Sequence, residues 1–177
     1  MGFIRTKRIK GNQYAYHVEN KWKKKTSKQK VRQYLGRVYI IEKKQDFDFL
    51  NFIGSNDLLS YIEYNDKKRI ISDLIIYEAY CCGFKKIDKN KWRYNNIIIN
   101  LDNRTIIKHN KNIVLKMNEG FLCNHTLTKL FEFNQKGRSK DIALNFARLF
   151  VDAGLKIPKE IFVELFQKIN KNTKFLD

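Results

Sequence analysis

Proline is almost absent from this chain, with one residue among 177, and glycine and cysteine are scarce at eight and three. An apolar content of 43% is sufficient for a packed interior, so the chain is not a disordered basic tail. The cysteines Cys81, Cys82 and Cys123 are odd in number, so they predict no disulfide framework. The length fits one domain, or two small domains that share a core.

Long apolar runs are also lacking. No stretch reaches the ~18 apolar residues that a membrane-spanning helix needs. The first residues do not contain the apolar run of a signal peptide. We therefore expect a cytoplasmic protein without a membrane partner.

Motifs for catalysis, cofactors and metals are scarce. Only three histidines occur, and Cys123 with His125 has no second ligand pair at zinc spacing. Neither a P-loop nor a Gly-x-Gly-x-x-Gly sequence is present. The sequence therefore predicts no cofactor, no metal and no catalytic residue. A metal-dependent nuclease that uses Asp102, Glu119 and Asp141 is an open alternative, although any chain of this length offers three acids.

Acidic charge is nearly absent from the first forty residues, where Glu19 is the only acid. The same segment holds twelve of the 36 basic residues: Arg5, Lys7, Arg8, Lys10, Lys21, Lys23, Lys24, Lys25, Lys28, Lys30, Arg32 and Arg37. Its net charge of +11 is more than half of the +18 of the whole chain. A lysine surface that only aids solubility would not need this segregation. The asymmetry instead favours a polyanionic partner.

Alternating polarity predicts strands in this basic segment. Tyr14, Tyr16 and Val18 share one face of a strand, and Gly11-Asn12 is a turn signal before it. The polar residues 20–29 are expected to form a loop. The predicted strands are 3–10, 14–19 and 30–35, with a continuation at 38–41, and together they give an antiparallel β-meander over residues 1–45.

The remaining chain alternates between helix and strand signals. A connector over 42–56 leads to a second region, 56–177, for which we expect an α+β domain without an assigned role. Its predicted helices are 56–64, 66–82 begun by Asp66, 125–133 capped by Asn124, and two that form a C-terminal hairpin around Gly154 and Pro158. Its predicted strands are 84–87, 92–94, 97–101, 105–108 and 113–117.

The expected fold class is therefore α+β. It comprises an N-terminal basic antiparallel β-meander, a central helix, a second small antiparallel sheet and a C-terminal helical hairpin. The Cys81-Cys82 pair lies on the apolar central helix and is expected in the core.

A family resemblance covers residues 3–40. The order Tyr14-Ala15-Tyr16-His17-Val18-Glu19, then Val31-Arg32-Gln33, then Tyr34-Leu35-Gly36 resembles the N-terminal module of certain insertion-sequence DDE transposases. It is also similar to small uncharacterised archaeal proteins that open in the same way. The resemblance implies a module that helps to hold DNA. Residues 41–177 are too short for the catalytic domain of such a transposase, so it implies attachment and not transposition.

We therefore expect a non-catalytic nucleic-acid-binding protein that contacts phosphates of double-stranded DNA and is associated with the nucleoid. A factor bound to ribosomal or other structured RNA is the alternative. Tyr14 and Tyr16 could stack on bases or belong to the core. The candidate contact residues are Arg5, Lys7, Arg8, Lys10, Tyr14, Tyr16, Lys23, Lys24, Lys25, Lys28, Lys30, Arg32, Gln33, Arg37, Lys136, Arg138 and Lys140.

Overall fold

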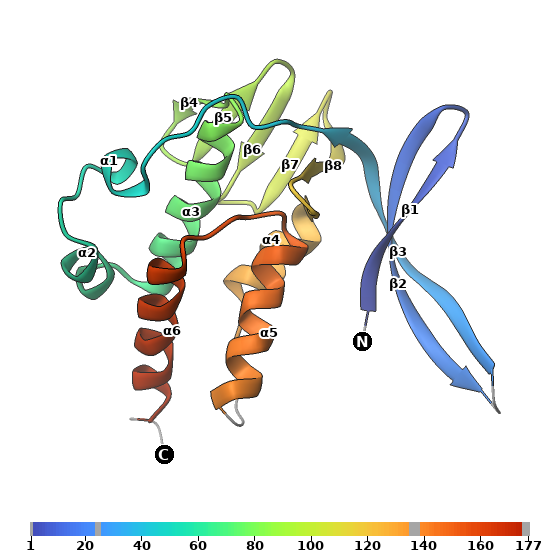
Figure 1. Ribbon diagram of the computed structural model, residues 1–177. Helices are drawn as coiled ribbons and strands as arrows, with labels where there is room; N and C mark the ends of the chain where they lie inside the picture. The colour runs from blue at the N-terminus through green and yellow to red at the C-terminus, as the bar shows by residue number, and fades with distance from the viewer. Residues whose placement is uncertain (1, 24–25, 135–138, 175–177) are drawn as a thin grey trace.

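The computed structural model describes residues 2–23, 26–134 and 139–174 (Figure 1). Its secondary structure confirms the α+β class and the N-terminal antiparallel meander. The meander consists of β1 (Gly2–Ile9), β2 (Asn12–Lys23) and β3 (Thr26–Ile40). The turn between β1 and β2 is made by Lys10 and Gly11, with φ of 47° and 77°. Two left-handed residues give the turn geometry that suits a tight hairpin, one position earlier than the sequence indicated.

Residues 20–23 and 26–29, which were expected in a loop, belong to strands. Strands β2 and β3 continue to pair beyond the end of β1, with Asn20 opposite Gln29 and Lys21 opposite Lys28. This two-stranded ribbon extends away from the rest of the molecule (Figure 1). Its described side chains are exposed on both faces. Local alternation of polarity is therefore missing, and the prediction was wrong for that reason.

The second set of strands follows the predicted order. It consists of β4 (Lys85–Asp88), β5 (Lys91–Tyr94), β6 (Ile97–Asn100), β7 (Thr105–Lys108), β8 (Lys111–Met117) and the unpredicted β9 (Gly120–Leu122). Several of its turns use left-handed residues, among them Asn95, His109, Asn110 and Asn118. Asn tolerates this conformation better than most residues, which explains part of the asparagine abundance.

One parallel pairing joins the meander to the second set of strands. Residues Arg37–Ile40 of β3 pair with Ile113–Lys116 of β8, and the strand order becomes β1-β2-β3-β8-β7-β6-β5-β4. Gly36 lies at this junction with φ of 134°. A Cβ atom there would lie 2.6 Å from the carbonyl oxygen of Asn112. The close approach of the two strands therefore depends on glycine.

Six helices complete the described fold. They are α1 (Phe49–Ile53), α2 (Leu58–Tyr64), α3 (Lys67–Cys81), α4 (Asn124–Phe131), α5 (Ser139–Asp152) and α6 (Lys159–Lys174). Aspartate side chains accept backbone N–H groups at the starts of α1, α2 and α3, and Asp66 caps α3 as predicted. The α4 cap differs from the prediction. Cys123 is the cap residue, and the Asn124 side chain instead accepts the backbone N–H of Ile106.

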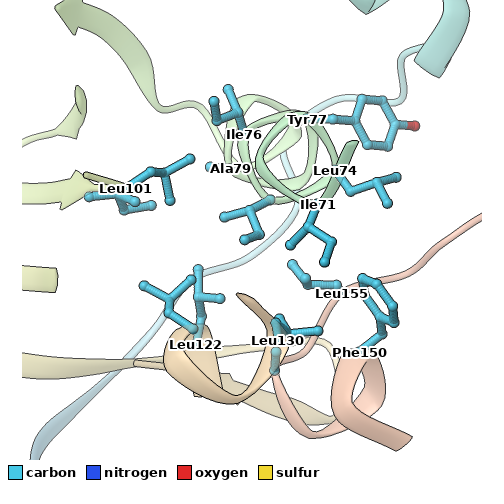
Figure 2. Packing of buried hydrophobic residues seen from close by; sticks show 14 of the residues in the cluster. Ile71, Leu74, Ile76, Tyr77, Ala79, Leu101, Leu122, Leu130, Phe150 and Leu155 are labelled. Atoms are coloured by element: carbon cyan, nitrogen blue, oxygen red, sulfur yellow. The ribbon is translucent and has the colours of Figure 1, made fainter. Parts of the chain in front are cut away.

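Helix α3 forms the centre of the main core. Figure 2 shows its side chain Ile71 directed toward Leu130 of α4 and Leu155 after α5, and Leu74 and Phe150 belong to the same buried cluster. Ten of its fifteen residues are buried, which is typical of a helix surrounded by protein. Cys81 and Cys82 belong to this cluster, as predicted. We call the structure outside the meander, β4–β9 and α1–α6, the body.

A second, smaller cluster lies where the meander meets the body. Ala15, Leu35 and Val38 pack there against Val114 and Cys123, and Ile4 lies at its margin. The meander residues of this cluster, Ile4, Ala15, Leu35 and Val38, define the inner face of the meander. The meander therefore has one face against the body and an opposite face that is open to solvent.

The last helix is held by an ammonium group as well as by its apolar face. Lys168 of α6 donates to the carbonyl oxygens of Ile62, Glu63 and Asn65, at 2.6, 2.8 and 2.6 Å. These carbonyls lie at the C-terminal end of α2, where a cation also interacts favourably with the helix dipole. No helix in the described part of the chain is both long and apolar enough to cross a membrane.

Candidate nucleic-acid interface

Strand alternation assigns several predicted contact residues to the exposed face of the meander. In β1, Phe3, Arg5 and Lys7 are exposed, whereas Gly2, Ile4 and Thr6 between them are partly buried. Side chains of directly paired residues lie on the same face of a sheet. The register therefore places the tyrosines of β2 beside the cations of β1.

Two cross-strand rows result from this register. The first is Lys7, Tyr14 and Arg37, and the second is Arg5, Tyr16 and Tyr34. Each row contains at least one tyrosine and one cation. We call the surface formed by these six residues and Phe3 the outer face. Five of these residues are exposed, namely Phe3, Arg5, Lys7, Tyr34 and Arg37, and Tyr14 and Tyr16 are half-buried.

Tyr34 contacts the other two tyrosines of the outer face. The ring of Tyr34 lies with its centroid 5.4 Å from that of Tyr16 and 6.3 Å from that of Tyr14, at tilted angles. The side chain of Tyr34 leaves 55% of its surface exposed. Burial, and then the neighbouring Tyr14, Tyr16 and Tyr39, raise the pKa of Tyr34. The phenol is therefore neutral near pH 7.

A fourth tyrosine extends this surface toward the body. The guanidinium carbon of Arg37 lies 5.2 Å from the centroid of the Tyr39 ring, and Nζ of Lys108 lies 4.3 Å from the same centroid. Both distances are within the range of cation–π contacts. Sequence reasoning missed Tyr39 and Lys108, because Lys108 reaches this position only through the long-range pairing of β3, β8 and β7.

Two β-bulges determine which side chains of β3 reach the outer face. Tyr16 pairs with Tyr34 while Ala15 pairs with Gly36, so Leu35 is an extra residue. In the same way, Arg32 is extra between the partners of His17 and Val18. A bulge changes the direction of the following side chains. The strict alternation predicted for residues 30–35 therefore does not hold, and Leu35 is buried on the inner face.

Arg32 is engaged within the protein. Its Nε donates to Glu19 Oε2 at 2.5 Å, and the hydrogen bond from Arg32 holds the pKa of the Glu19 carboxyl below its usual range. Arg5 also has an internal partner, since its Nη1 donates to Gln29 Oε1. The one acid of the basic segment is thus neutralised by a neighbouring cation.

Other predicted residues lie away from the outer face. Gln29 reaches Arg5 on that face, so its neighbours Lys28 and Lys30 project to the opposite side of the two-stranded ribbon. Gln33 lines a cavity of about 340 Å³ beside Lys111, Asn112 and His125. The structure therefore divides the predicted contact residues between two faces.

Two of the remaining predicted residues lie beside a turn, and the structure does not describe the side chains of the others. Arg8 and Lys10 are exposed beside the first hairpin turn. Lys24, Lys25, Lys136 and Arg138 lie outside the described residues, as do the side chains of Lys23 and Lys140.

A histidine pair joins the inner face of the meander to the body. The rings of His17 in β2 and His125 in α4 lie 4.3 Å apart, and Nε2 of each has no hydrogen-bond partner among the described residues. Burial lowers the pKa of both imidazoles, to about 4 for His125, and the nearby Lys129 ammonium acts in the same direction. Both rings are therefore neutral near pH 7.

The carboxylates of the nuclease alternative lie on the surface. Asp102, Glu119 and Asp141 are exposed, and Asp102 accepts a hydrogen bond from Asn90. Within residues 2–23, 26–134 and 139–174, no group of three or more His, Cys, Asp or Glu side chains could hold a metal ion.

Comparisons with known proteins give one partial similarity. No protein-family model matches the chain, and no solved structure gives a significant match. The ATP-binding protein Uup of Buchnera aphidicola subsp. Acyrthosiphon pisum (strain APS) is 35% identical over 85 residues, which are 47% of this chain. The chain spans only 14% of the length of that protein. This share is too small for the name of that protein to define the class of the present chain.

Proposed function

We propose that this chain binds nucleic acid through the outer face of its N-terminal meander, as an attachment surface. The observation that carries the proposal is the pair of cross-strand rows in which three tyrosines stand beside Arg5, Lys7 and Arg37. Cations neutralise phosphates, and aromatic rings offer a surface on which bases stack. The outer face supplies both groups within one exposed surface.

Double-stranded DNA is the ligand that the sequence favours, and structured RNA is the alternative. A two-stranded antiparallel ribbon can enter the major groove of DNA. The ribbon of β2 and β3 beyond Glu19 has this form and carries Lys21 and Lys28, and Lys30 lies opposite Glu19 at its base. It therefore supports the duplex ligand, with contacts that are separate from those of the outer face.

The test is a salt titration of binding to duplex DNA and to structured RNA. If about eight cations meet phosphates, affinity falls by roughly 10³–10⁵ between 50 and 200 mM salt. The triple variant Arg5→Gln, Lys7→Gln, Arg37→Gln removes the three cations of the outer face. For duplex DNA it should reduce the slope of log affinity against log salt by about 2.7.

A matched control removes three cations from the other end of the sheet. Lys85, Lys86 and Lys89 are exposed in and after β4, and their replacement by Gln changes the net charge by the same amount. The control should keep the original slope. An equal loss in both triple variants would show that binding depends on net charge alone and would contradict a specific surface.

The same binding experiments also test the two alternative functions, an RNA-binding factor and a metal-dependent nuclease. Tighter binding to structured RNA than to duplex DNA at equal salt would favour the RNA-binding factor. Cleavage of the substrate after prolonged incubation with Mg²⁺ would favour the nuclease instead of an attachment protein.

A further inference from the structure

We infer that the outer face of the meander binds unpaired bases, so that the preferred ligand contains a single-stranded segment. This inference rests on the proposed nucleic-acid binding and specifies its ligand. It departs from the duplex that the sequence alone favours. The argument depends on where Tyr14, Tyr16 and Tyr34 lie.

The position of the tyrosines is unusual for a purely structural group. Tyr34 keeps 55% of its surface exposed, although its ring is surrounded by Tyr14 and Tyr16 at centroid distances of 6.3 and 5.4 Å. Phe3 on the same face is 41% exposed. Large exposed apolar surface that gathers in one place is typical of an interaction site.

The form of this surface favours bases over phosphates alone. Phosphates require cations, and Arg5, Lys7 and Arg37 supply these without any help from aromatic rings. Tyrosines add a stacking surface. Bases within a duplex already stack on one another, and only unpaired bases can turn toward a protein ring. A cluster of tyrosines with an exposed ring, Tyr34, and with cations in the same two rows therefore has a role with a single strand that a duplex would not use.

The spacing of the cations fits a strand that crosses the rows. Lys7 and Arg37 flank Tyr14 from the neighbouring strands, and Arg5 flanks Tyr16 on the side away from Tyr34. A backbone that follows Arg5 and Lys7 along β1 would bring its bases over Tyr16 and Tyr14 in the neighbouring strand, with Tyr34 beyond Tyr16. The neutral phenol of Tyr34 adds no charge that would repel a phosphate.

The first experiment measures the affinity of the full chain for an unpaired oligothymidylate of about 12 nucleotides and for a duplex of equal length. The variant Tyr34→Leu keeps an apolar side chain that can pack against Tyr14 and Tyr16, but it removes the aromatic ring. We expect its affinity for the single strand to fall between about 5-fold and 100-fold. Its affinity for the duplex should change by less than about 2-fold.

The control variant is Tyr64→Leu. Tyr64 lies in α2 with 85% of its surface exposed, far from the meander in sequence and in Figure 1. This substitution should leave both affinities unchanged. Circular dichroism and thermal unfolding of each variant establish that any loss of binding occurs in a folded protein.

A second experiment separates stacking from a structural role of Tyr34. Abasic sites at successive positions of the oligothymidylate remove one base each and keep every phosphate. For the original protein, one or more abasic sites should weaken binding by about 5-fold or more. For Tyr34→Leu the same sites should have a smaller effect, because the stacking partner is already absent.

The outcomes distinguish the two proposals. Loss of single-strand and duplex binding to the same extent in Tyr34→Leu, with no sensitivity to abasic sites, would overturn the stacking inference and leave nucleic-acid binding intact. Absence of binding to any oligonucleotide at low salt would overturn the proposed function itself.

Discussion

Aromatic side chains have different surroundings in the two regions of the molecule. In the body, Phe146 is fully buried and its ring contacts those of Phe133, Phe150 and Phe162. In the meander, Tyr34 contacts other tyrosines and yet is 55% exposed. The same kind of ring cluster thus stabilises the interior in one region and forms an accessible surface in the other. The difference comes from what covers each cluster. The rings of the body lie on and beside helices that pack against one another, whereas the outer face of the meander has no layer above it in the described structure.

The largest effect should follow from a cavity in the body. Phe146→Ala removes a buried ring, and we expect the free energy of unfolding to fall by about 3–5 kcal/mol. The corresponding change in the meander, Phe3→Ala, should cost about 1 kcal/mol or less, since Phe3 is 41% exposed. Denaturant unfolding of both variants measures the difference. Equal losses would show that the meander depends on its aromatic surface as much as the body depends on its core.

An intermediate effect is expected where the two regions join. Gly36→Ala adds a methyl group 2.6 Å from the carbonyl oxygen of Asn112 and forces alanine to a φ of 134°. The expected loss is about 2 kcal/mol, because the strained backbone and the close contact both oppose the pairing of β3 with β8.

The control for this junction is Gly54→Ala. Gly54 also has a positive φ, of 69°, but a Cβ there meets no atom within 4 Å. We expect a loss of about 1 kcal/mol. Hydrogen exchange should show weaker protection of β3 in Gly36→Ala only. Equal loss and unchanged protection in both variants would contradict a close approach at Gly36.

The smallest effect concerns pH and the contact between His17 and His125. Both imidazoles have a lowered pKa in the folded protein, whereas in the unfolded chain they titrate near 6.5. Below about pH 6.5 the unfolded chain therefore binds more protons, and the free energy of unfolding should decrease as the pH falls toward about 4. Since both rings are only partly buried, we expect a loss of about 1 kcal/mol.

The groups that face these rings modify this dependence. Lys129 lowers the pKa of both imidazoles, and Glu19 raises that of His17. Asp152 lines a small pocket together with His17 and His125, and burial raises its pKa. Its own contribution to stability therefore grows as the pH falls. His125→Phe should keep the ring contact and flatten the pH dependence. The control His109→Asn, at an exposed turn, should leave the pH dependence of stability unchanged. If the original protein and both variants showed the same pH dependence, the dependence could not be assigned to His17 and His125.

Local sequence signals predicted the elements that depend on neighbouring residues. Asp66 and Gly83 bound α3 because a cap and a stop act within a few positions. The short strands between residues 84 and 117 were predicted because their turns contain Asn and Asp. Sequence reasoning also placed Tyr14 and Tyr16 on one face. It left open whether that face was the core, which depends on what covers it.

The features that were missed depend on contacts between distant segments. The bulge residues Leu35 and Arg32 shift the register of β3 against β2. No local sequence pattern predicts a bulge at these positions. The parallel pairing of β3 with β8 brings Lys108 beside Tyr39 across nearly seventy positions of sequence. The ribbon formed by residues 20–23 and 26–29 has polar residues on both faces, so alternation could not reveal its strands.

The strand order has a consequence for association between copies of the protein. The path of the sheet ends at β1 on one side and at β4 on the other, and a terminal strand presents backbone groups that can pair with a strand of another molecule. Exposed cations occupy both ends, Arg5 and Lys7 in β1 and Lys85 and Lys86 in β4. When two copies approach edge to edge, these like charges repel. The basic residues of β1 therefore also protect the sheet from growing into an aggregate.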